Sequence, residues 1–338
     1  MSGKASKGRG LTRVGDFELL KELAAPERPV SRQEEGFLSA AVATQNQPAD
    51  EDLTYMAREL VQCTLPHSDP GQVPFWKRTN GNLTLSIVSD YDPESGKLVG
   101  YPFGSIPRLV LFWLTTEALR TGSRKLELGK SYSGFLRDLG LDPNTGRGER
   151  GDAFRVRNQT RRLFTSRISF IHNYQENFKG EHMNAEARVQ MSIASKSLLW
   201  WDPKRPNQTN LWGSWIELSP EFFHAITSAP VPLDMRALKA LKRSPLALDL
   251  YAWATHKSNY VARKGKAQFI PWVSLASQFG SDYKKHLDFK RKAKAALKKI
   301  EAVYPSLKLQ DATGGLTILP STRSAVAPKN VRRILTAK

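Results

Sequence analysis

The hydrophobic and polar positions along the chain predict one order of elements that occurs twice. In the first half the order is a helix, a short strand, two further helices and a hairpin, predicted over 105–122, 125–128, 135–140, 152–167 and 168–201. Ser105 and Pro107 are expected to open the first helix as cap and first-turn proline, and Gly122 to end it. The hairpin is predicted from strands at 168–174 and 189–201 that flank a polar tip.

The same order is predicted again toward the C-terminus. A helix, a short strand, a helix, a long basic helix and a hairpin are predicted over 244–253, 269–270, 273–280, 282–303 and 307–319. Two segment pairs are similar between the copies: 105–113 with 244–253, and 135–140 with 275–280. These parallels indicate an internal duplication, and we expect a strand within 212–223 to bridge the two copies.

Helix, short strand, helix, helix and hairpin is the order of the winged helix, a helix-turn-helix variant whose third helix enters the major groove of DNA. The predicted fold class is therefore α+β, with two tandem winged-helix domains related by internal duplication and with flexible basic tails. The predicted segments are a mostly disordered basic N-terminal tail, the first domain with an N-terminal extension and a long hairpin, the second domain, and a basic C-terminal tail, over 1–50, 51–205, 206–322 and 323–338. Within the N-terminal segment we expect one helix over 31–45.

The third helix of the first copy separates apolar from polar positions when its residues are placed ~100° apart. Its apolar arc contains Phe154, Val156, Leu163, Phe164 and Ile168. The other side holds the predicted DNA-binding residues Arg155, Asn158, Gln159, Arg162 and Ser166. Arginine, asparagine and glutamine are side chains that pair bidentately with guanine or adenine edges. Arg157 and Arg161 fall toward the apolar side, which weakens the pattern.

The long basic helix of the second copy is divided more sharply. Its apolar stripe consists of His286, Phe289, Ala293, Ala296, Leu297, Ile300 and Tyr304. Opposite lie the predicted DNA-binding residues Lys284, Asp288, Arg291, Lys294 and Lys298. A solvated amphipathic face is the alternative, but a helix balanced for solubility mixes Glu with Lys four residues apart. This helix has only three acidic residues against eight basic residues between 284 and 299, so we predict that it contacts DNA.

The net charge indicates a polyanionic partner. The chain has 51 Lys and Arg against 32 Asp and Glu, a formal charge of +19, which attracts nucleic acid or an anionic membrane. The basic residues gather in the two third helices and in both tails, which differs from an amphipathic membrane-surface helix. The longest apolar run, 109–114, is far shorter than the ~20 residues of a membrane span, and no secretory signal is expected. We expect a soluble cytoplasmic protein with no membrane partner.

Candidate motifs for catalysis fail on their context. Residues 146–151 fit G-x-G-x-x-G, but no strand precedes them. Gly129-Lys130-Ser131 has the end of a P-loop, but Arg124 stands where that motif needs glycine. The six histidines are scattered, and Cys63 is the one cysteine. We predict no catalytic residue, no metal and no cofactor, so the chain is not expected to be an enzyme.

Three segments resemble the RepA-type plasmid replication initiators: 101–118, 126–129 and 133–141. The resemblance continues more diffusely through 249–253 and the second basic helix, and it covers about residues 75–320. It implies two tandem winged helices that bind direct repeats (iterons) in double-stranded origin DNA and melt a nearby AT-rich segment. It also implies recruitment of the host replication initiator and of the replicative helicase.

The resemblance further implies self-association and copy control. In related initiators the first winged helix supports dimerisation, dimers being repressive and monomers active in replication. By this analogy Lys284, Arg291 and Lys298 belong to the main iteron-reading helix, and the hairpin over 168–201 makes a dimer or DNA contact. Three alternatives stay open: a transcriptional repressor without an initiation role, an origin-nicking nuclease, and a ribosome- or RNA-binding protein.

Overall fold

The computed structural model describes residues 30–129, 131–145, 150–178, 181–198, 213–280, 283, 285–321 and 325–326. Its fold is α+β, as predicted. None of the helices in these ranges is long and apolar enough to span a bilayer. The predicted N-terminal tail as far as residue 29 and most of the predicted C-terminal tail lie outside the described residues.

The predicted order of elements in the first half is confirmed. The elements are α4 (Ser105–Thr121), β4 (Lys125–Glu127), α5 (Tyr132–Asp138), α6 (Asp152–Thr165), β5 (Arg167–Phe178) and β6 (Glu181–Ser192). Gly122 ends α4 with a φ of 65°, a left-handed conformation that glycine adopts without strain. The start of α4 differs from the expectation, because Gly104 is the N-cap and Ser105 is the first helical residue.

The second half contains α7 (Pro220–Ser228), β9 (Pro230–Asp234), α8 (Met235–Leu241), α9 (Pro245–Lys264), β10 (Gln268–Pro271), α10 (Trp272–Phe279), α11 (His286–Val303), β11 (Leu309–Ala312) and β12 (Gly315–Ile318). From α9 onward this is the predicted order. Ser244 caps α9 as predicted, because its Oγ accepts the N–H of Ala247. The basic helix α11 begins at His286 instead of Asp282, and Lys285 is its N-cap.

The short strands β4 and β10 lie in three-stranded sheets of the same arrangement. β10 pairs with β12, which pairs with β11. In the same way β4 pairs with β8 (Trp215–Leu218), which pairs with β7 (Ala194–Leu198). The strand expected within 212–223 is present as β8, and its hydrogen bonds place it inside the sheet that contains β4 and β7. A domain boundary between residues 205 and 206 separates two strands of that sheet.

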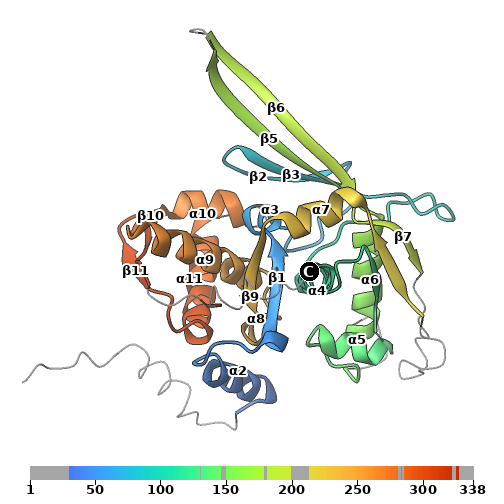
Figure 1. The fold of residues 1–338 in the computed structure, drawn as a ribbon, viewed down its shortest axis with the longest axis horizontal. Coiled ribbons are helices and arrows are strands. Elements are labelled where there is room, and N and C mark those ends of the chain that lie inside the picture. Colours follow the sequence, from blue (N-terminus) through green and yellow to red (C-terminus); the bar gives the residue numbers. More distant parts are fainter. Residues whose placement is uncertain are drawn as a thin grey trace, which may run out of the picture.

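The hairpin predicted over 168–201 is divided between two sheets. β5 and β6 form a long hairpin, and β5 also pairs with β3 (Leu83–Val88), which pairs with β2 (Trp76–Asn80). The buried cross-strand pairs Leu85–Phe170 and Ile87–Ile168 hold this register. The four-stranded sheet has the order β2-β3-β5-β6, so β6 is an edge strand. The far end of the hairpin extends away from the rest of the molecule (Figure 1).

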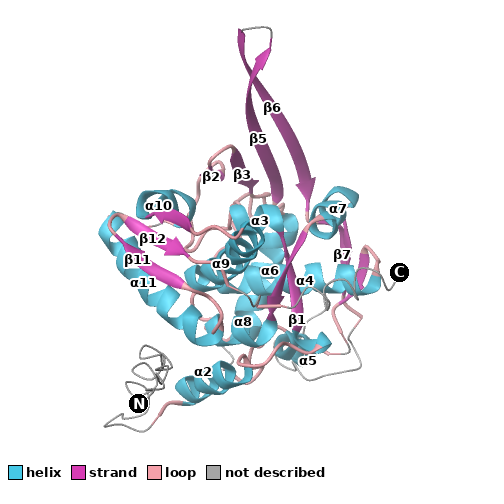
Figure 2. Cartoon of the chain, turned by 60° about the vertical axis from the view of Figure 1, so that its left-hand side comes forward, coloured by secondary structure: helices cyan, strands magenta, loops and turns pink. Residues whose placement is uncertain are grey.

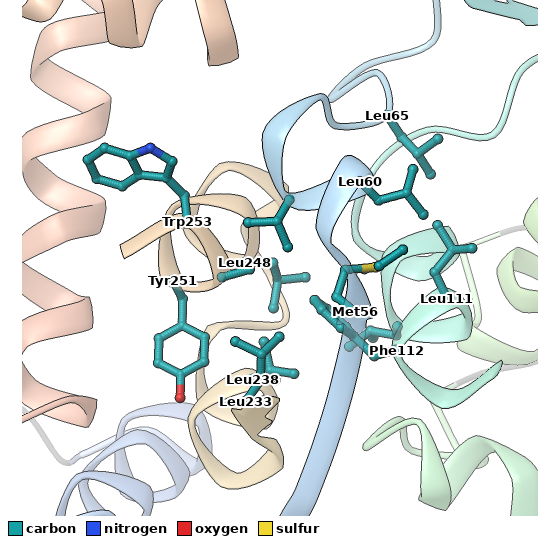
Figure 3. Packing of buried hydrophobic residues seen from close by; sticks show 14 of the residues in the cluster. Met56, Leu60, Leu65, Leu111, Phe112, Leu233, Leu238, Leu248, Tyr251 and Trp253 are labelled. Atoms are coloured by element: carbon teal, nitrogen blue, oxygen red, sulfur yellow. The ribbon is translucent and has the colours of Figure 1, made fainter. Parts of the chain in front are cut away.

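Strand β1 (Leu53–Ala57) joins the two halves of the chain. It pairs antiparallel with β9, in a register that runs from Leu53 opposite Asp234 to Ala57 opposite Pro230. Buried side chains of the two strands, such as Met56 and Leu233, belong to one hydrophobic cluster with side chains from both halves of the chain, such as Phe112 and Leu248 (Figure 3). The two halves therefore share a hydrophobic core.

Part of the segment expected to be a disordered tail is folded. Helix α2 (Arg32–Ala43) confirms the helix expected over 31–45, and it begins with a capping box between Ser31 and Glu34. It packs on α8, where the Arg236 guanidinium donates to the carbonyl oxygens of Ala43 and Asn46. In the predicted C-terminal tail, Val326 is buried against Leu53, Tyr55 and Leu119 of the first half.

An ionic network of buried side chains links α4 to α9. Arg108 of α4 donates to both carboxylate oxygens of Asp249 in α9, at 2.7 and 2.8 Å. The same guanidinium donates to the carbonyl oxygens of Leu65, Pro66 and Gly104. The Asp249 Oδ2 is also 2.8 Å from the His67 Nε2, so this oxygen has a second donor within hydrogen-bond distance.

Burial and the neighbouring charged groups together set the pKa values of His67 and Asp249. Burial lowers the pKa of His67, so the ring is neutral at pH 7 and its Nε2–H donates to the carboxylate. Burial alone would raise the pKa of Asp249, but the Arg108 charge and the His67 hydrogen bond outweigh it and hold that pKa well below its usual range. The Asp249 carboxylate is therefore ionised at any pH near neutrality and forms an ion pair with Arg108.

We expect Asp249→Asn to lower the free energy of unfolding by about 3–5 kcal/mol, because it leaves the Arg108 charge buried without its counter-ion. Urea titration followed by tryptophan fluorescence measures the change. The matched control is Glu117→Gln, which breaks the exposed ion pair with Arg120 and should cost about 0–1 kcal/mol. Equal midpoints for the two variants would contradict the importance of the buried pair.

Candidate nucleic-acid interface

Helix α11 packs against the core through one face. Phe289, Ala293, Ala296, Leu297, Ile300 and Val303 are buried along it. The apolar stripe predicted for this helix is thus correct except at its start. His286 is exposed, since it is the first residue of the helix and lies before the first turn that packs on the core.

The opposite face of α11 carries exposed cations. Arg291 has 76% of its side chain exposed, and Lys294 and Lys298 follow it on the same side of the helix. Asp288 is half-exposed and pairs with Arg291 at 3.3 Å, which orients the guanidinium along the helix surface. Lys284, the fifth residue predicted here, lies outside the described residues.

Helix α11 lies beside the hairpin β11–β12 (Figure 2). Lys294 Nζ is 2.7 Å from the Asp311 carboxylate in β11. A groove of about 290 Å³ lies between the helix and the hairpin. The residues that line it include Trp272, Lys298, Leu309 and Leu316. The ammonium groups of Lys290 and Lys294 lie 5.8 and 5.9 Å from the centre of the Trp272 ring. The cations therefore belong to α11, and the hairpin beside them contributes the Asp311 carboxylate and apolar residues.

Two of the five residues predicted on α6 face solvent. Arg155 is exposed and pairs with Asp152 one turn earlier, at 3.3 Å. Asn158 is half-buried on the same side. Phe154 is exposed instead of buried, because it lies in the first turn of α6, ahead of Val156, the first residue of the helix that is buried in the core.

The other three predicted residues of α6 hold the fold together. Gln159 is buried, and its Oε1 accepts the N–H of Phe103 at 2.8 Å. Ser166 is fully buried and donates to the carbonyl of Arg162. The Arg162 guanidinium donates to Asp69 and to the carbonyl of Tyr101. The prediction of an open polar face at Gln159, Arg162 and Ser166 is therefore wrong, because the segment before α4 covers that side of the helix.

Two of the exposed cations of α6 are at positions that the sequence pattern assigned to the apolar side. Arg157 and Arg161 are both exposed, and Arg161 is paired with Asp92 of the loop before α4. A helical wheel centred on the buried residues Val156, Thr160 and Leu163 places Arg161 outward and Arg157 on the flank of the helix. The basic surface of α6 is thus Arg155, Arg157 and Arg161, and carboxylates of this chain already pair with Arg155 and Arg161.

The residues described by the structure contain no group of three or more histidine, cysteine and acidic side chains that could hold a metal ion. Cys63 is fully buried, and burial raises the pKa of its thiol to about 11. That thiol is therefore protonated at neutral pH and shielded from solvent.

An α+β chain of net charge +19 with a cationic helix beside a hairpin has the charge distribution of a nucleic-acid-binding protein. The family described as plasmid-encoded RepA protein matches residues 101–274, and the chain belongs to this family of plasmid replication initiators. The resemblance predicted from the sequence is confirmed. The matched segment runs from the residues before α4 into α10, so α11 lies beyond it.

Two solved structures, both of domains 2 and 3 of RctB, are similar to parts of the chain. One is 12% identical with a TM-score of 0.45 and covers 76% of this chain and 95% of its own. The other is 11% identical with a TM-score of 0.44 and covers 77% of this chain and 94% of its own. No curated protein matches the chain.

We expect Gln159→Ala to lower the free energy of unfolding by about 1–3 kcal/mol, because the buried N–H of Phe103 loses its acceptor. Chemical denaturation measures the loss. Asn158→Ala, a change at the neighbouring half-buried position, is the control and should stay within about 0.5 kcal/mol of the parent. A larger loss of stability in Asn158→Ala than in Gln159→Ala would contradict the structural role of Gln159.

Proposed function

We propose that this protein initiates plasmid replication by binding directly repeated duplex DNA at the origin, and that it acts by binding rather than by catalysis. The observation that carries the proposal is the row of exposed cations on α11, a helix whose other face is fixed in the core. Arginine and lysine on a helix of this kind can reach guanine edges in the major groove and phosphates beside it. Origin DNA is the partner that membership of an initiator family implies.

Two tandem winged helices are the arrangement that we propose for DNA binding. In each half a first helix, a short strand, two helices and a hairpin follow one another, and the strand orders β4-β8-β7 and β10-β12-β11 correspond. The rings of Trp113 and Phe135 meet edge to face at 5.1 Å in the first half. Those of Trp253 and Phe279 meet in the same way at 6.1 Å in the second half. Equivalent packing between the first and second helices supports the duplication.

On this proposal the domain boundary lies later than residue 205. The first module would extend through β8, with β7 and β8 as its wing. The sheet β2-β3-β5-β6 would be an addition peculiar to the first copy. We propose α11 as the main DNA-reading helix and α6 as a weaker contact, because α6 offers fewer cations and carboxylates already pair with two of them.

Opening of an AT-rich segment and recruitment of the host replication initiator and helicase complete the proposed role, which would be carried out in the cytoplasm. A plasmid without its own origin, supplied with this gene and the repeats beside it, should be maintained. Failure to replicate, with intact binding to the repeats, would favour a transcriptional repressor. Relaxation of supercoiled origin DNA in the presence of Mg²⁺ would favour a nicking enzyme, and tighter binding to structured RNA would favour an RNA-binding protein.

We expect Arg291→Ala to weaken binding to the repeats by about 1–3 kcal/mol if the guanidinium contacts a base. Arg120→Ala is the control, because Arg120 is similarly exposed but lies at the end of α4. With ~6–10 phosphate contacts, parent affinity should fall by about 10³–10⁵ between 50 and 200 mM salt. Fluorescence anisotropy with labelled repeats measures all three. Parent affinity in both Arg291→Ala and Lys294→Ala would remove α11 from the interface.

We also propose that β6 mediates self-association. It is the edge of the four-stranded sheet, and its side chains from 183 to 190 are exposed on both faces. One face carries Met183, Ala185, Ala187 and Val189, and the other carries Asn184, Glu186, Arg188 and Gln190. An edge strand with an exposed apolar row can pair with a further strand.

The sequence of β6 is complementary to itself. If two copies of β6 pair antiparallel about Ala187, then Glu186 of each copy lies opposite Arg188 of the other. Glu186 and Arg188 are already on the same face, 3.0 Å apart within one strand. The same register places Ala185 opposite Val189 on the apolar face. Opposite charges and apolar residues in facing positions stabilise an antiparallel pair.

We expect Ala187→Cys to form a disulfide-linked dimer under mild oxidation, because the pairing axis brings residue 187 opposite itself. Non-reducing electrophoresis measures the dimer, and the buried Cys63 does not compete. Gln190→Cys should remain monomeric, since residue 184 faces it in this register. Cross-linking of Gln190→Cys but not of Ala187→Cys would show that β6 does not pair about Ala187.

A further inference from the structure

Leu287 stands out among the apolar residues of α11 by its exposure. It lies in the first turn of the helix and is 77% exposed, whereas the other large apolar side chains described in this helix are buried. A single exposed leucine on a protein surface needs no explanation by itself. The position of this leucine relative to the cations of α11 is what distinguishes it.

Leu287 belongs to the same row as the cations. Arg291, Lys294 and Lys298 follow it at spacings of four, three and four residues, which place all of them on one side of a helix. This side is opposite the buried residues Phe289, Ala293 and Ile300. The outward face of α11 therefore begins with an apolar side chain and continues with positive charge.

We infer that Leu287 recognises the C5-methyl group of a thymine in the bound repeats, an inference that rests on the proposed function of α11. The major groove displays one apolar group, the thymine methyl, and apolar side chains contact it. The N-terminal residues of a recognition helix are the ones that reach base edges. Leu287 is the second residue of α11, so it enters the groove while Arg291 and Lys294 contact neighbouring bases or phosphates.

This assignment gives Leu287 a role in specificity that is separate from the electrostatic role of the cations. Phosphate contacts carry no direct sequence information and act on every duplex alike. A methyl contact distinguishes a T·A pair from the same pair with uracil, because uracil differs from thymine only in lacking that methyl. Removing either partner of the contact should have the same effect on affinity, and removing both should have no additional effect.

A double-mutant cycle between protein and DNA tests the inference. The full chain selects its duplex from a random-sequence pool, and each thymine of that duplex is replaced in turn by uracil. At one position we expect the substitution to weaken binding about fourfold, the effect of one methyl lost from an apolar contact. Leu287→Ala should lose about fourfold or more on the thymine duplex and show no further loss on the uracil duplex.

Two control variants separate the possible outcomes. Val42→Ala removes an exposed apolar side chain from α2 (70% exposed) and should leave both duplexes unaffected. Arg291→Ala should weaken both duplexes equally. If Leu287→Ala binds like the parent, or binds weakly but keeps the full uracil penalty, the inference is overturned while the proposed function stands. If Arg291→Ala and Leu287→Ala both bind like the parent, the role proposed for α11 fails as well.

Discussion

The ion pair between Arg108 and Asp249 is the contact on which the arrangement of the two halves depends. A guanidinium that is almost fully buried cannot be left without partners, and this one is satisfied by a carboxylate of the other half and by three carbonyl oxygens of its own. Apolar packing around β1 and β9 supplies bulk stability but little directional preference. The ion pair adds direction, because it holds α4 and α9 in one relative orientation. Helices α6 and α11 pack on α4 and α9, so their relative placement depends on that orientation.

The two cationic helices differ in how their charges are used within the protein. Carboxylates from loops outside α6 pair with Arg161 and Arg162, so contacts within the protein neutralise part of the positive charge of α6. The cations of α11 instead pair within the helix or with the adjoining hairpin, as Arg291 and Lys294 do. An incoming phosphate would have to displace a structural contact at α6, whereas at α11 it meets exposed side chains. The exposed cations of α6 and α11 are thus held differently by the rest of the chain.

Much of this fold could be predicted from local pattern, and the misses have physical causes. The Ser244 cap, the Gly122 terminus and the apolar stripe of α11 depend on neighbours within a few residues, and the sequence reveals them. The partner of a strand does not follow from local pattern, so the sequence did not predict that β4 pairs with β8. The burial of Gln159 and Ser166 depends on a covering segment about sixty residues earlier in the sequence. Leu287 was not part of the apolar stripe predicted for the basic helix, and the structure shows it exposed on the side that carries the cations.

The pairing of β1 with β9 also bears on how the chain acquires its structure during synthesis. Leu53 and Asp234 are opposite each other although the elements from α3 to α7 lie between them in sequence. While the polypeptide is being translated, β1 stays without its partner until the ribosome has released the residues of β9. Contacts of such long sequence separation form slowly, because a large loop must close first. The part of the chain made before β9 thus contains a strand whose partner is added late in synthesis.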